Sequence, residues 1–330
     1  MGISFTGWLS QVSEDLDTDH GPMWAATRGA YYAYLGVWHT LTSRYPVGTN
    51  IFERDWDALI VLDACRVDAL RAVADDYEFI ESVDSVWSVG STSHEWASKT
   101  FTEQYRDEIA GTGYVTGNGY LHQAAVRDTY PPSGGTAPVG WPDWNVVDIE
   151  DFGHVDQVWQ DGRIEQLRTV PPYQLTDRAV EAGRKRDLDR LIVHYMQPHS
   201  PYIADAVDGR EVDPNAVEFV EPLGAMRRGE LDPELARERY MENLHLVLEE
   251  VETLLSNLDA ERVAITADHG ELFGEYGEYG HPDGLPFPEV RKVPWVTTTA
   301  TDTGEYEPTI DRNDTEVDVE EHLADLGYVV

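Results

Sequence analysis

The sequence has little positive charge and almost no cysteine. Its 330 residues contain 24 lysines and arginines against 62 aspartates and glutamates, which gives a formal net charge of −38. Lys and Arg side chains make the phosphate contacts that drive nucleic acid binding, so this composition argues against a nucleic acid partner. It also opposes docking on anionic lipid. Cys65 is the only cysteine, which excludes an internal disulfide.

The acidic residues are spread along the whole chain and are not confined to a tail. In ordinary salt so much negative charge destabilises the compact state by self-repulsion. At molar salt the Debye length is about 3 Å, so this repulsion is largely screened. The composition therefore predicts a halophilic protein, from a salt-adapted organism.

The sequence also lacks a transmembrane segment and a standard signal peptide. Residues 23–42 form the most apolar early stretch, but Arg28 and two glycines interrupt it. We expect there an amphipathic helix packed on the main domain; a helix lying at a membrane interface is the alternative. These features predict a cytoplasmic protein, with peripheral membrane contact left open.

Strand-like runs alternate with helical patterns from about residue 57 onward. The clearest helix covers residues 232–258, where Asp232 is a cap and Pro233 suits the first turn. The alternation predicts an α/β fold with a mainly parallel central sheet and helices on both faces. We expect a helical N-terminal extension at 1–52 and one domain at 53–330. The expected strands are 58–62, 77–80, 114–116, 146–149, 191–195, 263–266 and 293–297.

Polar side chains gather where these apolar runs end. Parallel strands bring their carboxyl ends to one edge of the sheet, and ligand sites lie beyond that edge. Carboxylate and imidazole together suit a divalent ion such as Mn²⁺, Zn²⁺ or Ca²⁺. A metal beside a hydroxyl creates a nucleophile at neutral pH, which suits phosphoryl or sulfuryl transfer. The candidates are Asp63, Ser91, Thr92, Ser93, His194, His199, Asp268, His269 and His281.

Several ordered motifs resemble the sulfatase-like branch of the alkaline phosphatase superfamily. They read IVLDACRVDAL, LIVHYMQPHSPY, ITADHGELFGEYGEYGH and VPW, and they follow the order of that family between about residues 57 and 298. The resemblance implies an alkaline phosphatase/sulfatase-like fold. It also implies a metal-dependent enzyme that acts on phosphate or sulfate esters.

The resemblance assigns roles to five of these residues. Asp63, Asp268 and His269 match the family's metal ligands. His199 matches the histidine that faces the transferred group. His281 matches a histidine that contacts the substrate or a second metal in phosphoethanolamine transferase and lipoteichoic acid synthase relatives.

The resemblance also implies that the nucleophile lies about thirty residues after the first acid, at the start of a helix. Ser93 lies thirty residues beyond Asp63 and is favoured over its neighbour Thr92. A helix N-terminus there would offer backbone N–H groups to an oxyanion. True sulfatases carry Cys-x-Pro-x-Arg or Ser-x-Pro-x-Arg, whereas this chain reads Ser-His-Glu-Trp-Ala at 93–97. An unmodified hydroxyl is therefore expected, which suits phosphate esters better than sulfate esters.

Other residues near these motifs have two interpretations. Arg66 could bind an anionic substrate oxygen bidentately or pair with a neighbouring aspartate. His194 could point to the core or to the site. Asp63 could merely cap the following helix. The acidic residues of the 271–278 loop, Glu271, Glu275 and Glu278, are interpreted as solvated.

The predicted function is a metal-dependent, sulfatase-like hydrolase with a Ser or Thr nucleophile. Its substrate would be a small-molecule, glycan or lipid ester of phosphate or sulfate. One alternative is a transferase that moves a phosphate-bearing head group to a lipid or glycan. Another is an inactive metal-binding relative that recognises anionic glycans.

Overall fold

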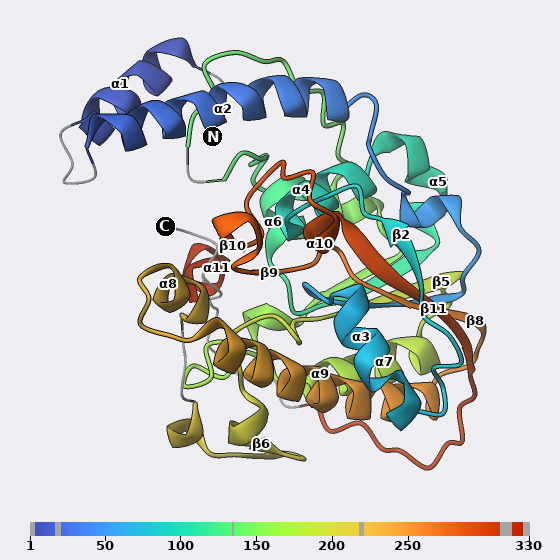
Figure 1. Cartoon of the computed structure of the whole chain (residues 1–330). Coiled ribbons are helices and arrows are strands. Elements are labelled where there is room, and N and C mark those ends of the chain that lie inside the picture. Colours follow the sequence, from blue (N-terminus) through green and yellow to red (C-terminus); the bar gives the residue numbers. More distant parts are fainter. Residues whose placement is uncertain (1–3, 17–20, 134, 218–220, 311–318, 326–330) are drawn as a thin grey trace.

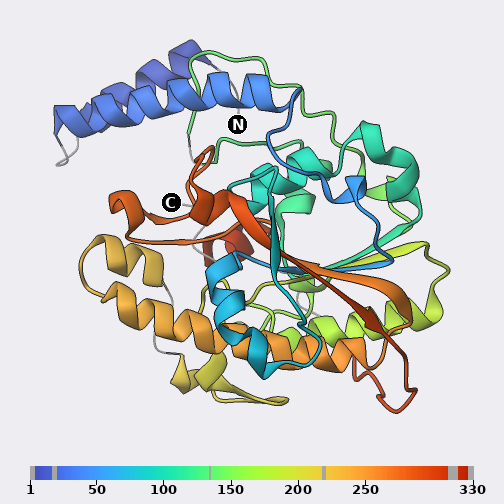
Figure 2. The ribbon, with the colours of Figure 1, turned by 45° about the vertical axis from the view of Figure 1, so that its right-hand side comes forward.

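The computed structural model describes residues 4–16, 21–133, 135–217, 221–310 and 319–325. Two N-terminal helices lie side by side at one end of the molecule, and the helix α9 lies at the opposite end (Figures 1 and 2). The α-helices are α1 (Phe5–Leu16), α2 (Pro22–Thr42), α3 (Val67–Val73), α4 (Ser93–Thr100), α5 (Arg106–Ala110), α6 (Tyr120–Ala125), α7 (Pro172–Lys185), α8 (Pro222–Arg227), α9 (Pro233–Leu255), α10 (Pro288–Arg291) and α11 (Val319–Asp325).

A seven-stranded sheet forms the centre of the main body, in the order β2-β11-β8-β1-β5-β3-β4. The strand β11 runs antiparallel to both of its neighbours, β2 and β8, and the other pairs in this sheet are parallel. Its strands are β1 (Ala58–Leu62), β2 (Asp84–Trp87), β3 (Thr112–Thr116), β4 (His154–Gln157), β5 (Arg190–Tyr195), β8 (Ala260–Thr266) and β11 (Lys292–Ala300). Two small hairpins use β6 (Val207–Asp208) with β7 (Glu211–Val212), and β9 (Leu272–Phe273) with β10 (Tyr279–Gly280).

Helices cover both faces of this sheet, as the sequence predicts. The two views place α3, α7 and α9 on one side and α4 and α6 on the other (Figures 1 and 2). The central strand β1 is buried along its whole length. Its continuous apolar run is typical of a strand that is covered on both faces.

The predicted strands at 77–80 and 146–149 are wrong. Residues 77–80 form a tight turn in which the Ile80 N–H donates to the Tyr77 carbonyl, over 3.0 Å. In the second segment Val146 makes only an isolated bridge to Thr102. Both segments are apolar because side chains such as Tyr77 and Val147 pack on the core. Burial alone therefore produced a strand-like pattern.

The strands β2 and β4 were not predicted from the sequence. Each lies at an edge of the sheet and pairs with a single neighbour. Their residues are half-buried or exposed, so neither strand has an apolar run. Short, polar edge strands are common because they limit pairing with other chains.

The helix α9 begins as the sequence predicts. The Asp232 side chain accepts a hydrogen bond from the Glu234 N–H, and Pro233 occupies the first position. Its buried residues recur at helical spacing down to Leu255. This helix covers the sheet and contacts α7 and α3.

The helix α2 corresponds to the apolar stretch 23–42 and packs on the main body, as expected. Its inner side buries residues such as Leu35, Gly36 and His39. Val139 crosses so closely that a Cβ on Gly36 would lie 1.7 Å from the Val139 carbonyl oxygen. No helix in the described part of the chain is both long and apolar enough to cross a bilayer. The domain boundary after residue 52 stays a prediction.

Candidate active site

The carboxyl ends of three adjacent strands bring the predicted acids together. The strands β5, β1 and β8 lie side by side in parallel, with Leu62 opposite Tyr195 and Val61 opposite Thr266. Asp63 follows β1 directly, and Asp268 follows β8 by two residues. The sheet therefore places these two carboxylates at one edge, although 205 positions separate them in the sequence.

Asp63 is fully buried at the centre of this cluster. Its Oδ2 accepts a hydrogen bond from Asn118 Nδ2 over 2.8 Å and from Ser93 Oγ over 3.3 Å. The Nε2 of His194 lies 3.5 Å from the same oxygen. Burial opposes ionisation, but the nearby imidazoles of His194, His199 and His269 hold the Asp63 pKa below its ordinary value. The residue is a buried anion and does not act as a helix cap.

Asp268 and His269 form a tight turn after β8. Asp268 Oδ1 accepts hydrogen bonds from the backbone N–H of Ala64 and of His269. His269 Nε2 lies 3.4 Å from Asp268 Oδ2 and 3.6 Å from Asp63 Oδ1. Gly270 is needed here for close approach, because a Cβ would lie 2.1 Å from the Glu289 carbonyl oxygen.

The two candidate nucleophiles occupy different environments. Ser93 is the first residue of α4, and its Oγ lies 3.2 Å from His269 Nε2 as well as near Asp63. Thr92 is the N-cap of that helix, and its hydroxyl accepts a hydrogen bond from the Glu95 N–H. It also donates to Asp283 over 3.1 Å. Only the Ser93 hydroxyl therefore faces the cluster of acids.

His199 and His281 face each other beside this cluster. Their Nε2 atoms are 3.0 Å apart, and the His281 ring lies 4.2 Å from the His269 ring between centroids. The Nδ1 of His199 bonds to the Ser200 carbonyl, which fixes the ring. Burial lowers the pKa of both histidines, so both are neutral in the folded protein near pH 7.

His194 and Arg66 differ in their relation to the cluster. His194 shares a hydrogen bond with the Tyr114 hydroxyl through Nδ1, and its Nε2 faces Asp63 and Asp268. It therefore points to the site. The Arg66 guanidinium bonds to Asp68 and Glu275, so the pairing alternative is the one that the structure contains.

Near the cluster, the sequence analysis missed Asn118 and misinterpreted Glu271. Asn118 follows β3 and donates to Asp63, so the strand-end rule applied to residues 114–116 would have found it. Glu271 was interpreted as solvated, which is wrong, since only 1% of it is exposed. Burial, and after it the charge of Asp63, raises the Glu271 pKa well above its ordinary value. Glu271 directly follows the Asp-His-Gly motif, and this position could have indicated that it lies near the site.

Two buried groups of side chains fit a divalent ion. Asp63, His194 and Asp268 form one, and their ligand atoms lie within 4.8 Å of one another; His199, Glu271 and His281 form the other. Among the described residues, Asp268 Oδ2 and Glu271 Oε1 are buried without a hydrogen bond. Burying a carboxylate oxygen without a partner is costly, so a cation at either oxygen would offset the cost. Carboxylate and imidazole are a suitable donor set for such an ion.

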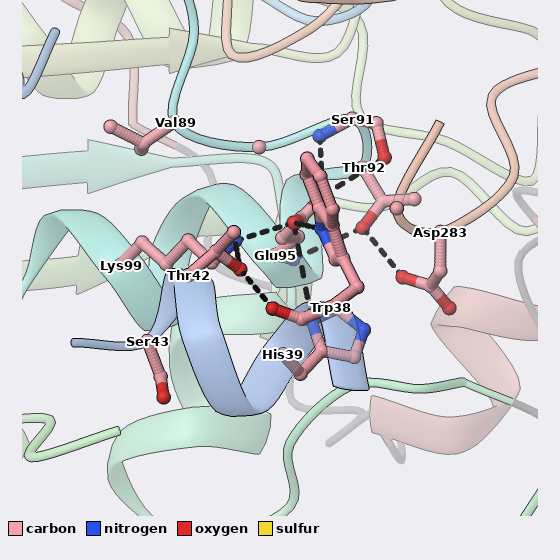
Figure 3. Close-up of polar contacts among 12 residues, drawn as sticks. Trp38, His39, Thr42, Ser43, Val89, Ser91, Thr92, Glu95, Lys99 and Asp283 are labelled. Carbon is pink, nitrogen blue, oxygen red and sulfur yellow. Dashed lines mark hydrogen bonds and ion pairs between the residues drawn. The ribbon is translucent and has the colours of Figure 1, made fainter. Parts of the chain in front are cut away.

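A second buried network is centred on Glu95, in the first turn of the helix α4 that Ser93 begins (Figure 3). Its carboxylate accepts hydrogen bonds from Trp38 Nε1 over 2.8 Å, from Lys99 Nζ over 2.5 Å and from Arg291. It also accepts from both the N–H and the hydroxyl of Ser91. This network joins α2 to the loop that precedes Ser93.

The charges in this network shift the acid–base properties of its members. Burial opposes ionisation of Glu95, but Arg291 and Lys99 hold its pKa well below the ordinary value. Burial lowers the pKa of Lys99 to about 8 despite the Glu95 charge. Burial likewise lowers the pKa of His39 to about 3. Beside Thr92, burial raises the pKa of Asp283 to about 6.

No family model matches the sequence, and no curated protein matches it. The chain is similar to the soluble domain of lipooligosaccharide phosphoethanolamine transferase A from Neisseria meningitidis, with 13% identity and a TM-score of 0.43, over 75% of this chain and 77% of that one. It is also similar to the periplasmic domain of phosphoethanolamine transferase EptC from Campylobacter jejuni, with 13% identity and a TM-score of 0.42, over 73% of this chain and 77% of that one. A third similar structure is a putative sulfatase from Bacteroides thetaiotaomicron, with 11% identity and a TM-score of 0.39, over 83% of this chain and 71% of that one.

These structures are sulfatases and phosphoethanolamine transferases, the kinds of protein that the motif resemblance predicts.

Proposed function

We propose that this protein is a metal-dependent hydrolase that cleaves phosphate esters through the hydroxyl of Ser93. The observation that carries the proposal is the position of that hydroxyl. It lies 3.3 Å from Asp63 Oδ2 and 3.2 Å from His269 Nε2, at the N-terminus of α4. A buried alcohol next to a carboxylate and an imidazole can lose its proton as it attacks.

Asp63, Asp268 and His269 would hold the ion, as the resemblance implies, and His194 lies close enough to join them. The bound ion would supply Lewis-acid stabilisation of the charge that develops on the transferred group. Asn118 donates a hydrogen bond to Asp63 and thereby orients its carboxylate. Partners of this kind fix the direction of a ligand and tune its basicity.

In the first step a bond forms between Ser93 Oγ and phosphorus while the bond from phosphorus to the leaving oxygen breaks. The serine proton passes to Asp63 Oδ2, the oxygen that accepts the hydrogen bond of the Ser93 hydroxyl. The leaving oxygen takes a proton from a water molecule held by the neutral His199 and His281, and the hydroxide that remains is available for the second step. In the second step this hydroxide attacks phosphorus, and Ser93 regains its proton as the phosphate leaves.

Phosphate is the preferred ester class because the residues of a sulfatase nucleophile motif are absent. Two positions after Ser93, where that motif carries proline, the chain places Glu95. Glu95 is fully buried and bonded to Lys99 and Arg291. The site therefore relies on an unmodified hydroxyl, which suits phosphoryl transfer better than sulfate ester cleavage.

The second group, His199, Glu271 and His281, leaves two interpretations open. It could hold a second ion, or its two histidines could serve the leaving oxygen directly. Metal content of the purified protein distinguishes them, because a second ion raises the stoichiometry from one to two and Glu271→Gln should return it to one.

The test is turnover of p-nitrophenyl phosphate and p-nitrophenyl sulfate in molar salt with Mn²⁺, Zn²⁺ or Ca²⁺. We expect phosphate turnover that requires the metal and Ser93, together with a phosphoserine at Ser93 in trapped enzyme by mass spectrometry. Metal binding without any turnover would favour an inactive relative that recognises anionic glycans. Turnover that survives Ser93→Ala would reject Ser93 as the nucleophile and leave the metal site standing.

The alternative activity is transfer of the phosphoryl group, or of a phosphate-bearing head group, to an acceptor alcohol on a lipid or glycan. The exposed apolar face of α2 favours a lipid acceptor. Product analysis with an added alcohol separates the two activities, because a transferase yields the new ester in place of free phosphate. The cytoplasmic location and the adaptation to salt stay predictions from the sequence.

A further inference from the structure

The helix α2 carries apolar side chains on its outer side. Its exposed positions Met23, Thr27, Ala30, Tyr34, Val37 and Leu41 follow one another at three- and four-residue intervals, so they lie along one side of the helix. Three of them are large and purely apolar: Met23 is 83% exposed, Val37 50% and Leu41 58%. We call these three the outer face of α2. A solvent-facing side of a helix is normally polar.

Exposed apolar side chains are concentrated around this helix. Fifteen large hydrophobic residues are exposed in the described part of the chain, and all but Trp87, Val126 and Tyr276 belong to residues 5–47 or to Val139 and Trp141. Val139 and Trp141 lie beside α2, since the Trp141 N–H donates to Thr40 Oγ1 over 2.7 Å and the Val139 carbonyl lies against Gly36. Such a concentration marks an interaction site, whereas scattered exposed apolar residues need no explanation.

The inner side of α2 fixes the direction of this face. The Tyr31 hydroxyl donates to the Asp283 carbonyl over 2.6 Å. Tyr34 lies at the border between the two sides, because its side chain is partly exposed while its hydroxyl donates to the Gly284 carbonyl over 2.7 Å. Further along the helix, Trp38 donates to Glu95, as the close-up shows (Figure 3). These contacts hold α2 against the main body, so its outer face stays at the surface.

The charge around α2 differs from that of the rest of the chain. Between His20 and Phe52 there are 33 residues and no aspartate or glutamate, while the whole chain has 62 in 330 residues. At that average density the stretch would hold about six acids. Arg28 and Arg44 are its only Lys or Arg residues. Acidic side chains, which are frequent in the rest of this chain, are therefore missing from α2 and the residues on either side of it.

We propose that the outer face of α2 docks on a lipid surface with electrically neutral head groups. Trp24, Tyr45 and Trp141 border the face and supply amphipathic rings of the kind that sit at head-group level. Two copies meeting through this face would bring two chains of net charge −38 together, whereas a neutral lipid surface adds no such repulsion.

Docking in this direction would bring the candidate active site close to the lipid. The segment 282–284 contacts the inner side of α2 and follows His281 directly. Only the thickness of one helix, about 10 Å, would separate that segment from the lipid. The docking itself rests on α2 and does not depend on the proposed function.

The experiment is flotation of the full chain with phosphatidylcholine vesicles in molar NaCl. The double variant Val37→Glu/Leu41→Glu places charge on the outer face, and the neutral pair Val37→Ser/Leu41→Ser removes apolar surface alone. Val126→Glu is the matched control, because Val126 is 47% exposed against 50% for Val37 and lies outside the 5–47 segment. Thermal unfolding of every variant checks that the fold is retained.

We expect the unsubstituted protein to float. The glutamate pair should lower the partition coefficient at least about tenfold, and the serine pair should lower it in the same direction, since buried apolar area sets the binding strength. Val126→Glu should bind as the unsubstituted protein does. Absence of flotation, or an equal loss in Val126→Glu, would overturn the proposal.

A second copy of this chain is the competing occupant, and analytical ultracentrifugation tests it. A dimer that the glutamate pair abolishes, in a protein that does not float, would assign the face to self-association and overturn docking on lipid. Turnover of p-nitrophenyl phosphate without vesicles is measured in parallel. Its outcome concerns the proposed function alone, so the two proposals can fail separately.

Discussion

The Oγ of Ser93 lies 3.2 Å from the Nε2 of His269, although 176 positions separate the two residues in the sequence. The serine begins α4, and the histidine follows β8. Their approach depends on the parallel arrangement of the strands and on the turn at Gly270. The predictions below test what this arrangement does and what holds it in place.

Replacing Ser93 with alanine should remove activity without removing the helix. We expect kcat for p-nitrophenyl phosphate to fall at least about a thousandfold, because the nucleophile is lost. Thr92→Ala is the matched control, since Thr92 caps the same helix but bonds to Asp283. It should cost about 1 kcal/mol of unfolding free energy through the lost cap and keep its turnover. The opposite pattern would make Thr92 the nucleophile.

Removing an acid of the cluster should remove the metal. In Asp268→Asn we expect the bound ion, measured by elemental analysis, to fall below one equivalent, because a carboxylate ligand becomes a neutral amide. Metal added at a hundred times its Kd should raise the unfolding free energy of the unsubstituted protein by about 2.7 kcal/mol, and chelation should reverse this. Asp302→Asn, which breaks a surface pair with Arg184, is the control. An unchanged metal content in Asp268→Asn would contradict the assignment.

Glu95→Gln should destabilise the protein strongly. The fully buried carboxylate bonds to both Lys99 and Arg291, and its neutralisation leaves two buried cations without a counter-charge. We expect a loss of about 3–5 kcal/mol in unfolding free energy, measured by denaturant titration in molar salt. The control is Glu181→Gln, which breaks the exposed pair with Lys185 and should cost about 1 kcal/mol or less. Equal effects would show that burial of the network adds little.

The pH dependence of stability should report the burial of His39. Burial lowers the pKa of this histidine to about 3, against opposition from Glu95 and with help from Lys99 and Arg291. As the pH falls below the ordinary histidine value, the unfolded chain binds a proton that the folded chain does not. Between about pH 6.5 and pH 3, His39 alone should therefore remove about 1.4 kcal/mol of stability per pH unit of acidification. In His39→Leu the slope of unfolding free energy against pH should flatten by that amount, and an unchanged slope would contradict the prediction.

Central elements of the fold were predictable because their signals are local. The run at 58–62 is apolar at every position, and Asp232 with Pro233 marks the start of α9. The edge strands β2 and β4 were missed because their side chains are half-buried or exposed. In these strands the pairing comes from their neighbours, and a single segment of sequence does not contain that information.

Some residues of the candidate site could likewise be located from local sequence signals, and others could not. Asp63 and Asp268 were located because each follows a predicted strand, and the structure brings them together. The burial of Glu271 and the Glu95 network depend on contacts between segments far apart in the chain. Glu95 and Arg291, for instance, are separated by 196 positions. An acidic residue in a very acidic chain gives no local sign that it will be buried.

The attachment of α2 has a consequence for the order of events during synthesis. The carbonyl groups that Tyr31 and Tyr34 contact belong to residues 252 and 250 positions later in the chain. Ribosomes add about 5–20 residues per second, so α2 waits roughly 10 to 50 seconds for its partners. During that interval the part of α2 that later packs on residues 283 and 284 is uncovered on the nascent chain. Aggregation on the ribosome should therefore be most sensitive to substitutions in this early segment, long before the main body is complete.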